Sequence, residues 1–143
     1  MDNDHSLARK RTLQLHERTF KFAAAVLLEC PRDPIPNIAA RELWRQLARA
    51  APSTSNNLLE ADEASSTLDF IAKMKIALRE AKESRNCLRF LVHCKLAPRW
   101  RDLMPLEDEA RQLSSIFATI LIRVKRRYED EKEARRKPRK SKN

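Results

Sequence analysis

Hydroxyl and amide side chains gather in the stretch Ser53-Thr-Ser-Asn-Asn57, where three hydroxyl groups precede two asparagines. A serine or threonine nucleophile needs a base that is positioned to take its proton. The 3 histidines of the chain are His5, His16 and His93, and none of them is a sequence neighbour of this stretch. Glycine is absent, so neither a GxSxG turn nor a glycine-rich phosphate loop can form. We therefore expect no catalytic residue and no enzymatic activity.

The candidate metal ligands are few and poorly placed. Cys87 and Cys94 are spaced to share one face of a helix, whereas His93 points about 100° away from Cys94 on an ideal helix. A closed zinc site needs a fourth ligand, and the sequence offers no obvious one. A di-iron bundle would need Glu-x-x-His motifs, and this chain has none. We expect no metal and no cofactor, and reduced cysteines in a core or an interface.

Basic residues are concentrated at the C-terminal end. The net charge is +10, and residues 123–143 hold 11 basic and 4 acidic residues, a balance of +7. Such a tail favours polyanions, nucleic acid first, although a purely solubilising tail is the competing interpretation. The side chains predicted to contact phosphates are Arg123, Lys125, Arg126, Arg127, Arg135, Arg136, Lys137, Arg139 and Lys140.

The elements that must position these residues are expected to be helices. Ala, Leu, Arg, Lys and Glu dominate, and the absence of glycine argues against tight β-hairpins. With 143 residues the chain suffices for one domain. Apolar periodicity predicts an antiparallel up-down-up-down bundle over residues 1–131, with helices at 6–30, 37–63, 66–95 and 105–131. Residues 132–143 are expected to form a disordered basic tail or a fraying helix.

More apolar residues are present than a single narrow core stripe would use. The first helix is expected to face the core with Leu13, Phe20, Ala23, Leu27 and Cys30. Other apolar residues lie off the main stripes, namely Trp44, Ile71, Leu78, Leu103, Ile116 and Leu121. They predict either scattered surface residues or, as we favour, a second buried face and hence self-association.

A polar signature surrounds Pro52 in the second helix. Proline has no N–H for the carbonyl of Ala48, so a kink is expected there. Small polar side chains near the kink are expected to bond the freed carbonyls, with Glu60 joining this network. The residues assigned to this structural signature are Arg49, Ser53, Asn57, Glu60, Glu80 and Glu83. The glutamates are expected to pair with basic residues of the same or neighbouring helices.

Two stretches carry a resemblance to a known family. Residues 46–61 read QLARAAPSTSNNLLEA, and residues 69–84 read DFIAKMKIALREAKES, followed by Leu88. They resemble the pattern Q-L-x-R-A, S-x-x-x-N-x-x-E and S-x-x-D-F…A-L-x-E-A-x-E-S of the bacterial four-helix-bundle proteins, also called 23S rRNA intervening-sequence proteins. The resemblance covers about residues 43–91. Ala61 departs from the glycine of many members.

The resemblance implies an assembly and a class of partner. It implies an antiparallel bundle that forms a ring, usually a homopentamer, and no known catalytic residue. A distant relative, the accessory protein of diversity-generating retroelements, binds nucleic acid and a reverse transcriptase. We therefore expect an oligomeric RNA- or DNA-binding protein. The alternative is a protein-interaction scaffold that recruits a partner such as a reverse transcriptase. Neither a secretory signal nor a membrane span is apparent, so a cytoplasmic location is expected.

Overall fold

The computed structural model describes residues 2–136 and is all-α over that range, as the composition predicted. It contains four α-helices, consistent with a four-helix bundle, and one short 3₁₀ helix before the last of them. Their bounds are α1 Asp2–Glu29, α2 Ile38–Asp62, α3 Thr67–His93, η1 Trp100–Leu103 and α4 Met104–Arg136. The described residues include no strand.

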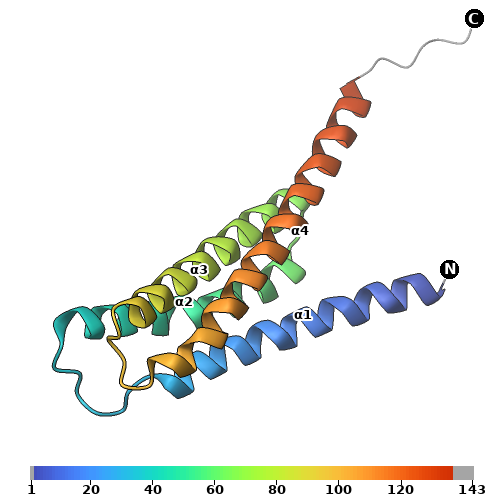
Figure 1. Ribbon diagram of the computed structural model, residues 1–143. Coiled ribbons are helices and arrows are strands. Elements are labelled where there is room, and N and C mark those ends of the chain that lie inside the picture. The colour runs from blue at the N-terminus through green and yellow to red at the C-terminus, as the bar shows by residue number, and fades with distance from the viewer. Residues whose placement is uncertain (1, 137–143) are drawn as a thin grey trace, which may run out of the picture.

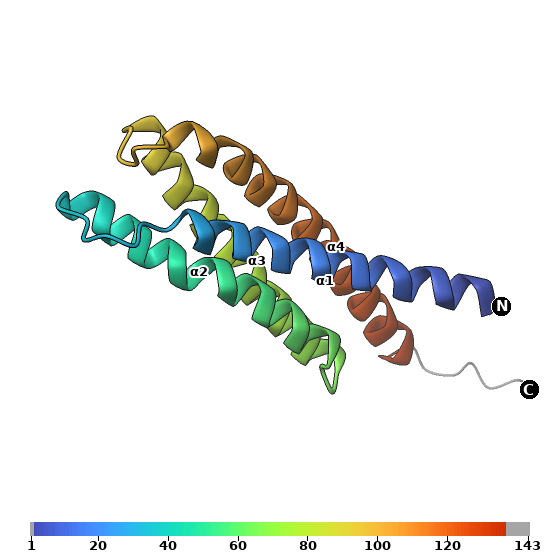
Figure 2. The same cartoon turned by 90° about the horizontal axis from the view of Figure 1, so that it is seen from below.

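The helices are joined by loops at alternate ends of the molecule. The α1–α2 loop and the connection between α3 and α4 lie at one end, and the α2–α3 turn lies at the other (Figures 1 and 2). α3 packs closely against both α2 and α4, whereas α1 packs mainly on α2 and touches α4 only sparsely. The first turns of α1 and the last turns of α4 extend past the α2–α3 turn (Figures 1 and 2).

Side-chain caps begin two of the helices, at the starts of the ranges 37–63 and 66–95 that the sequence predicted. The side-chain oxygen of Asn37 accepts a hydrogen bond from the Ala40 amide at 2.9 Å, which caps α2. Ser66 caps α3 by accepting from the Asp69 amide at 3.1 Å. The Asp69 carboxylate in turn accepts from the Ser65 amide at 3.3 Å, which completes a variant of the capping box. These bonds satisfy amide groups that have no acceptor within the helix.

The core is a continuous cluster of buried apolar side chains along all four helices. Its largest fully buried members include Phe117 of α4, Leu47 of α2 and Met74 of α3. The buried face of α3 includes Met74, Ala77, Ala81, Leu88 and Leu91. Pro52 is also incorporated into the uninterrupted helix α2, beside the buried Ala51.

The predicted core face of α1 is wrong for three of its five residues. Leu13, Phe20 and Leu27 are 51%, 59% and 46% exposed. α1 instead packs through a neighbouring face, whose buried members are Thr19, Phe22, Ala23 and Val26. The reason is that α1 has apolar residues on two sides, and periodicity alone does not say which side meets the bundle.

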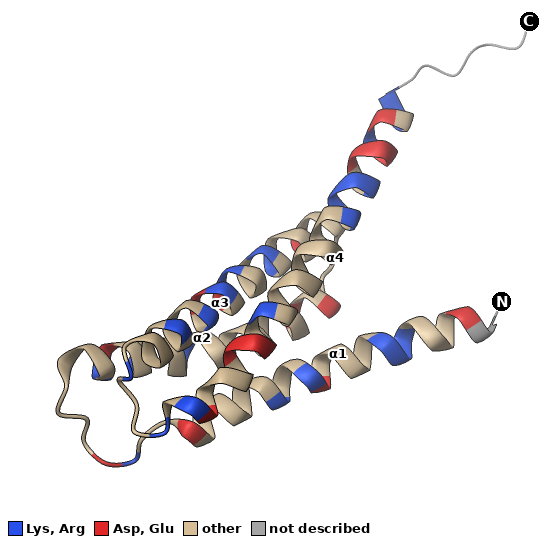
Figure 3. Cartoon of the chain, in the orientation of Figure 1, with Lys and Arg blue, Asp and Glu red and all other residues tan. Residues whose placement is uncertain are grey.

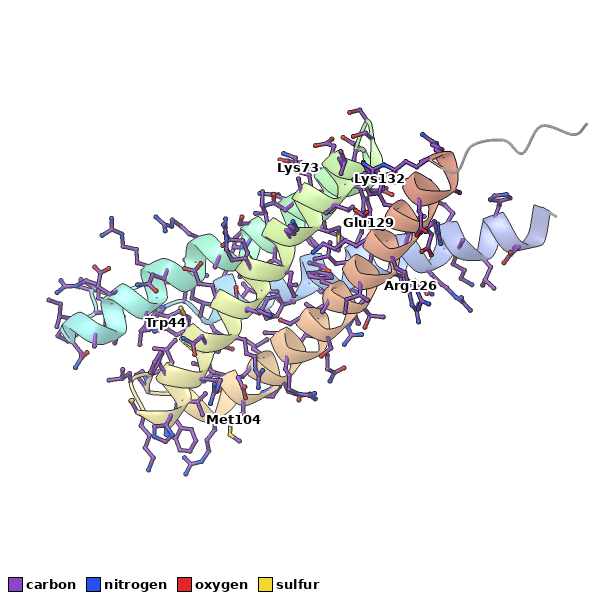
Figure 4. The ribbon with its side chains drawn as sticks, turned by 90° about the horizontal axis from the view of Figure 1, so that it is seen from above. Trp44, Lys73, Met104, Arg126, Glu129 and Lys132 are labelled. Carbon is purple, nitrogen blue, oxygen red and sulfur yellow. The ribbon has the colours of Figure 1, made fainter. Side chains whose placement is uncertain are left out.

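The apolar residues that lie off the main stripes are mostly packed inside the single chain. Trp44, Ile71, Leu103 and Leu121 are buried, and Figure 4 labels Trp44 on α2. Leu78 and Ile116 are partly buried and pack against the same core. An interior helix of a bundle contacts more than one neighbour, so its buried face is wider than one narrow stripe. The unpartnered apolar surface therefore does not lie at these six residues; it includes a row on α1, and single exposed apolar residues on the other helices, such as Ile122 of α4.

The helix ends differ from expectation at both termini. α1 begins at Asp2, before the expected start at Ser6, and α4 continues through Arg136, past the bundle boundary placed at 131. The last turns of α4 alternate acidic and basic residues that favour a helix, and Lys132 lies 4.0 Å from the Glu129 carboxylate. No helix among the described residues is long and apolar enough to cross a membrane.

Candidate nucleic-acid interface

The basic end of α4 forms an exposed cationic segment. The predicted contact residues on it are all solvent-exposed, namely Arg123, Lys125, Arg126, Arg127, Arg135 and Arg136. Within the described part of the chain, none of these six pairs with a carboxylate. The other predicted contacts, Lys137, Arg139 and Lys140, lie outside the described residues. This segment therefore offers unneutralised positive charge to an anionic partner.

The cations do not form a single stripe along α4. At 100° per residue, Arg123, Arg126 and Arg127 share one side of the helix, whereas Lys132 and Arg136 project from another. Figure 4 shows Arg126 and Lys132 extending to different sides of α4. Acidic residues 129–131 interrupt the basic sequence, and Figure 3 shows the resulting alternation along the last turns. A uniform, one-sided phosphate track is therefore not the arrangement found here.

The polar signature around Pro52 serves the helices themselves. The Asn57 amide donates to the Ser53 carbonyl at 2.9 Å and to the Ser53 hydroxyl at 3.1 Å, and the Thr54 hydroxyl donates to the Ala50 carbonyl. None of these acceptors is the Ala48 carbonyl that Pro52 leaves without a donor. The prediction that these side chains bond the carbonyl freed by the proline is therefore wrong. All of these side-chain bonds stay within α2, which gives this stretch a structural use.

The charged members of the signature are dispersed across the α2–α3 pair. Glu60 pairs with Lys73 of α3 at 2.7 Å and does not join the Asn57 network. Glu80 lies 3.7 Å from Arg79. Arg49 is exposed and pairs with no carboxylate within the described residues. The side chains that sequence spacing grouped together therefore do not converge on one site.

Cys30 and Cys87 are not activated nucleophiles. Burial, together with a smaller effect of the nearby Glu83 charge, raises the pKa of the Cys87 thiol to about 11. Burial also raises the pKa of Cys30. A thiol with a raised pKa stays protonated near neutral pH and reacts slowly. Among the described residues, no group of three or more potential ligands could hold a metal ion.

His16 forms a partly buried polar contact between α1 and α2. Its Nε2 atom lies 3.5 Å from the Asp62 carboxylate, which also accepts a hydrogen bond from Arg9 at 2.8 Å. Within the described chain the buried Nδ1 atom of His16 has no hydrogen-bond partner. The Asp62 contacts tie α1 to the end of α2, so we assign His16 and Arg9 a structural role.

A groove between α1 and α4 was not predicted from the sequence. It has a volume of about 710 Å³, and its lining includes the apolar Leu13, Phe22 and Leu106. Arg18 crosses it from α1 to donate to Glu109 and, at 2.8 Å, to Gln112 of α4. This hydrogen bond to Glu109 raises the pKa of the Arg18 guanidinium. The sparse contact between α1 and α4 is a tertiary property, so no local sequence signal could have revealed the groove.

Comparison with known proteins places this arrangement in a family. A family model described as 23S rRNA-intervening sequence protein matches residues 11–119, about three quarters of the chain. The chain belongs to the 23S rRNA-intervening sequence protein family. The match ends before Arg123, so the cationic segment of α4 lies beyond the residues that the family model matches.

A solved structure supports the same fold. This family member is similar to the crystal structure of a protein of unknown function from the S23 ribosomal protein family of Bacteroides thetaiotaomicron VPI-5482. The TM-score is 0.64 at 22% identity, and the similarity covers 75% of this chain and 97% of that one. At this identity the likeness shows the fold. A comparison with curated proteins gave no significant match.

Proposed function

We propose that this 23S rRNA-intervening sequence family protein is a non-enzymatic, oligomeric protein that binds nucleic acid through phosphate contacts. The observation that carries the proposal is the end of α4, where six exposed cations have no carboxylate partner within the described residues. Cations that neutralise phosphates release counterions from the nucleic acid, which supplies a sequence-independent free energy of binding. Lys137, Arg139 and Lys140 would continue this segment beyond the described residues.

The charge pattern favours recognition of the backbone over recognition of bases. Phosphate contacts position a nucleic acid, whereas base-edge contacts carry sequence information. Tyr128 is the one aromatic side chain within residues 123–136, so a platform for stacking several bases is lacking there. The family name refers to an intervening sequence of 23S rRNA, which supports RNA as the first ligand to test.

The proposed oligomer is a ring of antiparallel up-down-up-down bundles, with a homopentamer as the expected form. Its support in this chain is the exposed apolar face of α1, where Leu13, Phe20 and Leu27 recur at intervals of seven residues. A regular exposed row of large apolar side chains on one helix is typical of an interaction surface. A ring would also bring several copies of the α4 cations to one ligand and increase the avidity for a long polyanion.

The alternative function is a scaffold that recruits a protein such as a reverse transcriptase. The observation that favours it is the same apolar face together with the α1–α4 groove, since apolar surfaces fit protein partners better than phosphates. In that case the basic segment would only keep the protein soluble. Both alternatives assume a cytoplasmic protein that uses no membrane, metal or cofactor.

Salt-dependent titrations test the main proposal. Fluorescence anisotropy with a labelled single-stranded RNA and a DNA duplex should give binding that weakens steeply between low and physiological salt. For single strands, the slope of log K against log salt should be about −0.7 for each phosphate contact. Binding that ignores salt, or no binding by the intact protein at low salt, would contradict the proposal and favour the scaffold.

A further inference from the structure

A cleft lies where the last turns of α4 pass the beginning of α3. Its volume is about 400 Å³. It is lined by residues of both segments, namely Ser66, Thr67, Leu68, Tyr128, Glu131, Lys132, Arg135 and Arg136. Three of these residues are cations and three carry hydroxyl groups, whereas one is acidic. The lining is therefore suited to an anion of roughly phosphate size or larger.

The cations of this cleft are available to a ligand. Arg135 and Arg136 are exposed and pair with no carboxylate in the described chain. Lys132 approaches only Glu129, at 4.0 Å, and both side chains are largely exposed, so this pair is weak. An arriving phosphate could accept charge-assisted hydrogen bonds from all three without breaking a strong internal interaction.

The hydroxyl groups of Thr67 and Tyr128 add neutral donors from two different helices. Within the described residues neither hydroxyl has a hydrogen-bond partner, whereas the Ser66 hydroxyl already accepts from Asp69. The first amides of α3 also have no acceptor inside the helix. A helix start alone would not identify an anion site, but here the cations of α4 line the same cleft.

We propose that this cleft is the anchoring site for a backbone phosphate of the bound nucleic acid. The inference rests on the proposed function and deepens it, because it makes the cations of α4 unequal. Lys132, Arg135 and Arg136 act together with Thr67 and Tyr128 around one phosphate. Arg123 and Arg126 lie outside this cleft and contribute only to the general positive field.

A pair of double variants with equal charge change tests the anchoring site. Arg135→Ala with Arg136→Ala removes two cations from the cleft, and Arg123→Ala with Arg126→Ala removes two from elsewhere on α4. A charge-assisted hydrogen bond contributes about 1.5–3 kcal/mol, so the cleft variant should weaken RNA binding at least about tenfold. The control variant should weaken it only about two- to threefold, as expected for loss of long-range attraction.

A substitution that leaves the charge unchanged separates the contribution of a direct hydrogen bond from that of the net charge. Tyr128→Phe removes one hydroxyl and no charge, and it should weaken RNA binding about three- to fivefold through the loss of one neutral hydrogen bond. Circular dichroism of every variant checks that the helices are retained. Equal weakening by both double variants, with no effect of Tyr128→Phe, would overturn the anchoring site while leaving diffuse binding intact. Failure of the unaltered protein to bind RNA or DNA would instead overturn the proposed function.

Discussion

The Asn57 amide group donates to both the backbone carbonyl and the hydroxyl of Ser53, one turn earlier in α2. The two acceptors lie 2.9 Å and 3.1 Å from the amide nitrogen. This relationship explains why a stretch rich in hydroxyls and amides can lie inside a continuous helix beside Pro52. The polar groups satisfy one another locally, so the helix does not have to open at the proline.

Replacing Asn57 should therefore cost stability and not ligand affinity. Alanine favours a helix more than asparagine does, so the exposed Asn56 provides a matched control on the same turn. Chemical denaturation should show Asn57→Ala to be about 1 kcal/mol less stable than Asn56→Ala, which is the contribution of a typical hydrogen bond. If the two variants were equally stable and Asn57→Ala abolished RNA binding, the stretch would be a functional site after all.

The exposed row on α1 should control self-association. Phe20→Glu places a charge at the centre of that row, at a side chain that is 59% exposed in the single chain. Because the core is untouched, the variant should stay helical while its mass by light scattering falls toward the monomer value of 16.7 kDa.

Ile122→Glu is the corresponding control for that experiment. Ile122 is a large apolar residue of α4 that is also exposed, and it lies outside the α1 row. This variant should keep the mass of the unaltered protein. An unaltered protein that is already monomeric, or equal dissociation by both substitutions, would argue against α1 as the assembly face.

Local signals in the sequence predicted the helices well but not the way in which they meet. The prolines at 31, 34 and 36 and the caps at Asn37 and Ser66 act within a few residues, so the loops and helix starts could be recognised. The choice between the Leu13 face and the Phe22 face of α1 depends on α2, which is distant in sequence. Only tertiary packing decides that choice, and the stripe prediction failed there.

For the candidate site, too, the sequence predicted the properties of single residues but not their neighbours in space. Residue type and charge were sufficient to predict that Arg135 and Arg136 are exposed cations. Their neighbours across the cleft, Thr67 and Ser66, come from the start of another helix, and only the fold brings them together. The sequence pattern therefore predicted a basic segment, whereas its continuation as a helix past residue 131 and its contact with the start of α3 required the structure.

The three cysteines should differ in reactivity with pH. Cys94 is exposed, whereas Cys87 is buried with a pKa near 11. A thiol reagent at pH 8 should label Cys94 rapidly and Cys87 only as the protein opens. Because the folded pKa of Cys87 exceeds its ordinary value of 9.0, its contribution to stability is present below pH 9 and is lost as pH rises toward 11.

Mass spectrometry of the labelled peptides follows the labelling of Cys94 and of Cys87. Cys94→Ser should remove the fast phase of labelling. Denaturation midpoints of Cys87→Ala and the unaltered chain should converge as the pH is raised above 9. Rapid labelling of Cys87 at pH 8 in the folded protein would contradict its buried position.

Arg18 should hold α1 against α4, because contacts between these helices are otherwise sparse. Its guanidinium donates to Glu109 and Gln112 across the groove, and these side chains are only partly buried. Solvent screening limits the contribution of such a pair to about 1 kcal/mol, so Arg18→Ala should speed amide exchange in α1 about fivefold. Exchange in α3, which packs on both α2 and α4, should change less.

Lys21→Ala is the matched control, since Lys21 is exposed and pairs within α1 with Glu17. Uniform acceleration in all helices would mean that α1 does not open separately from the rest of the bundle.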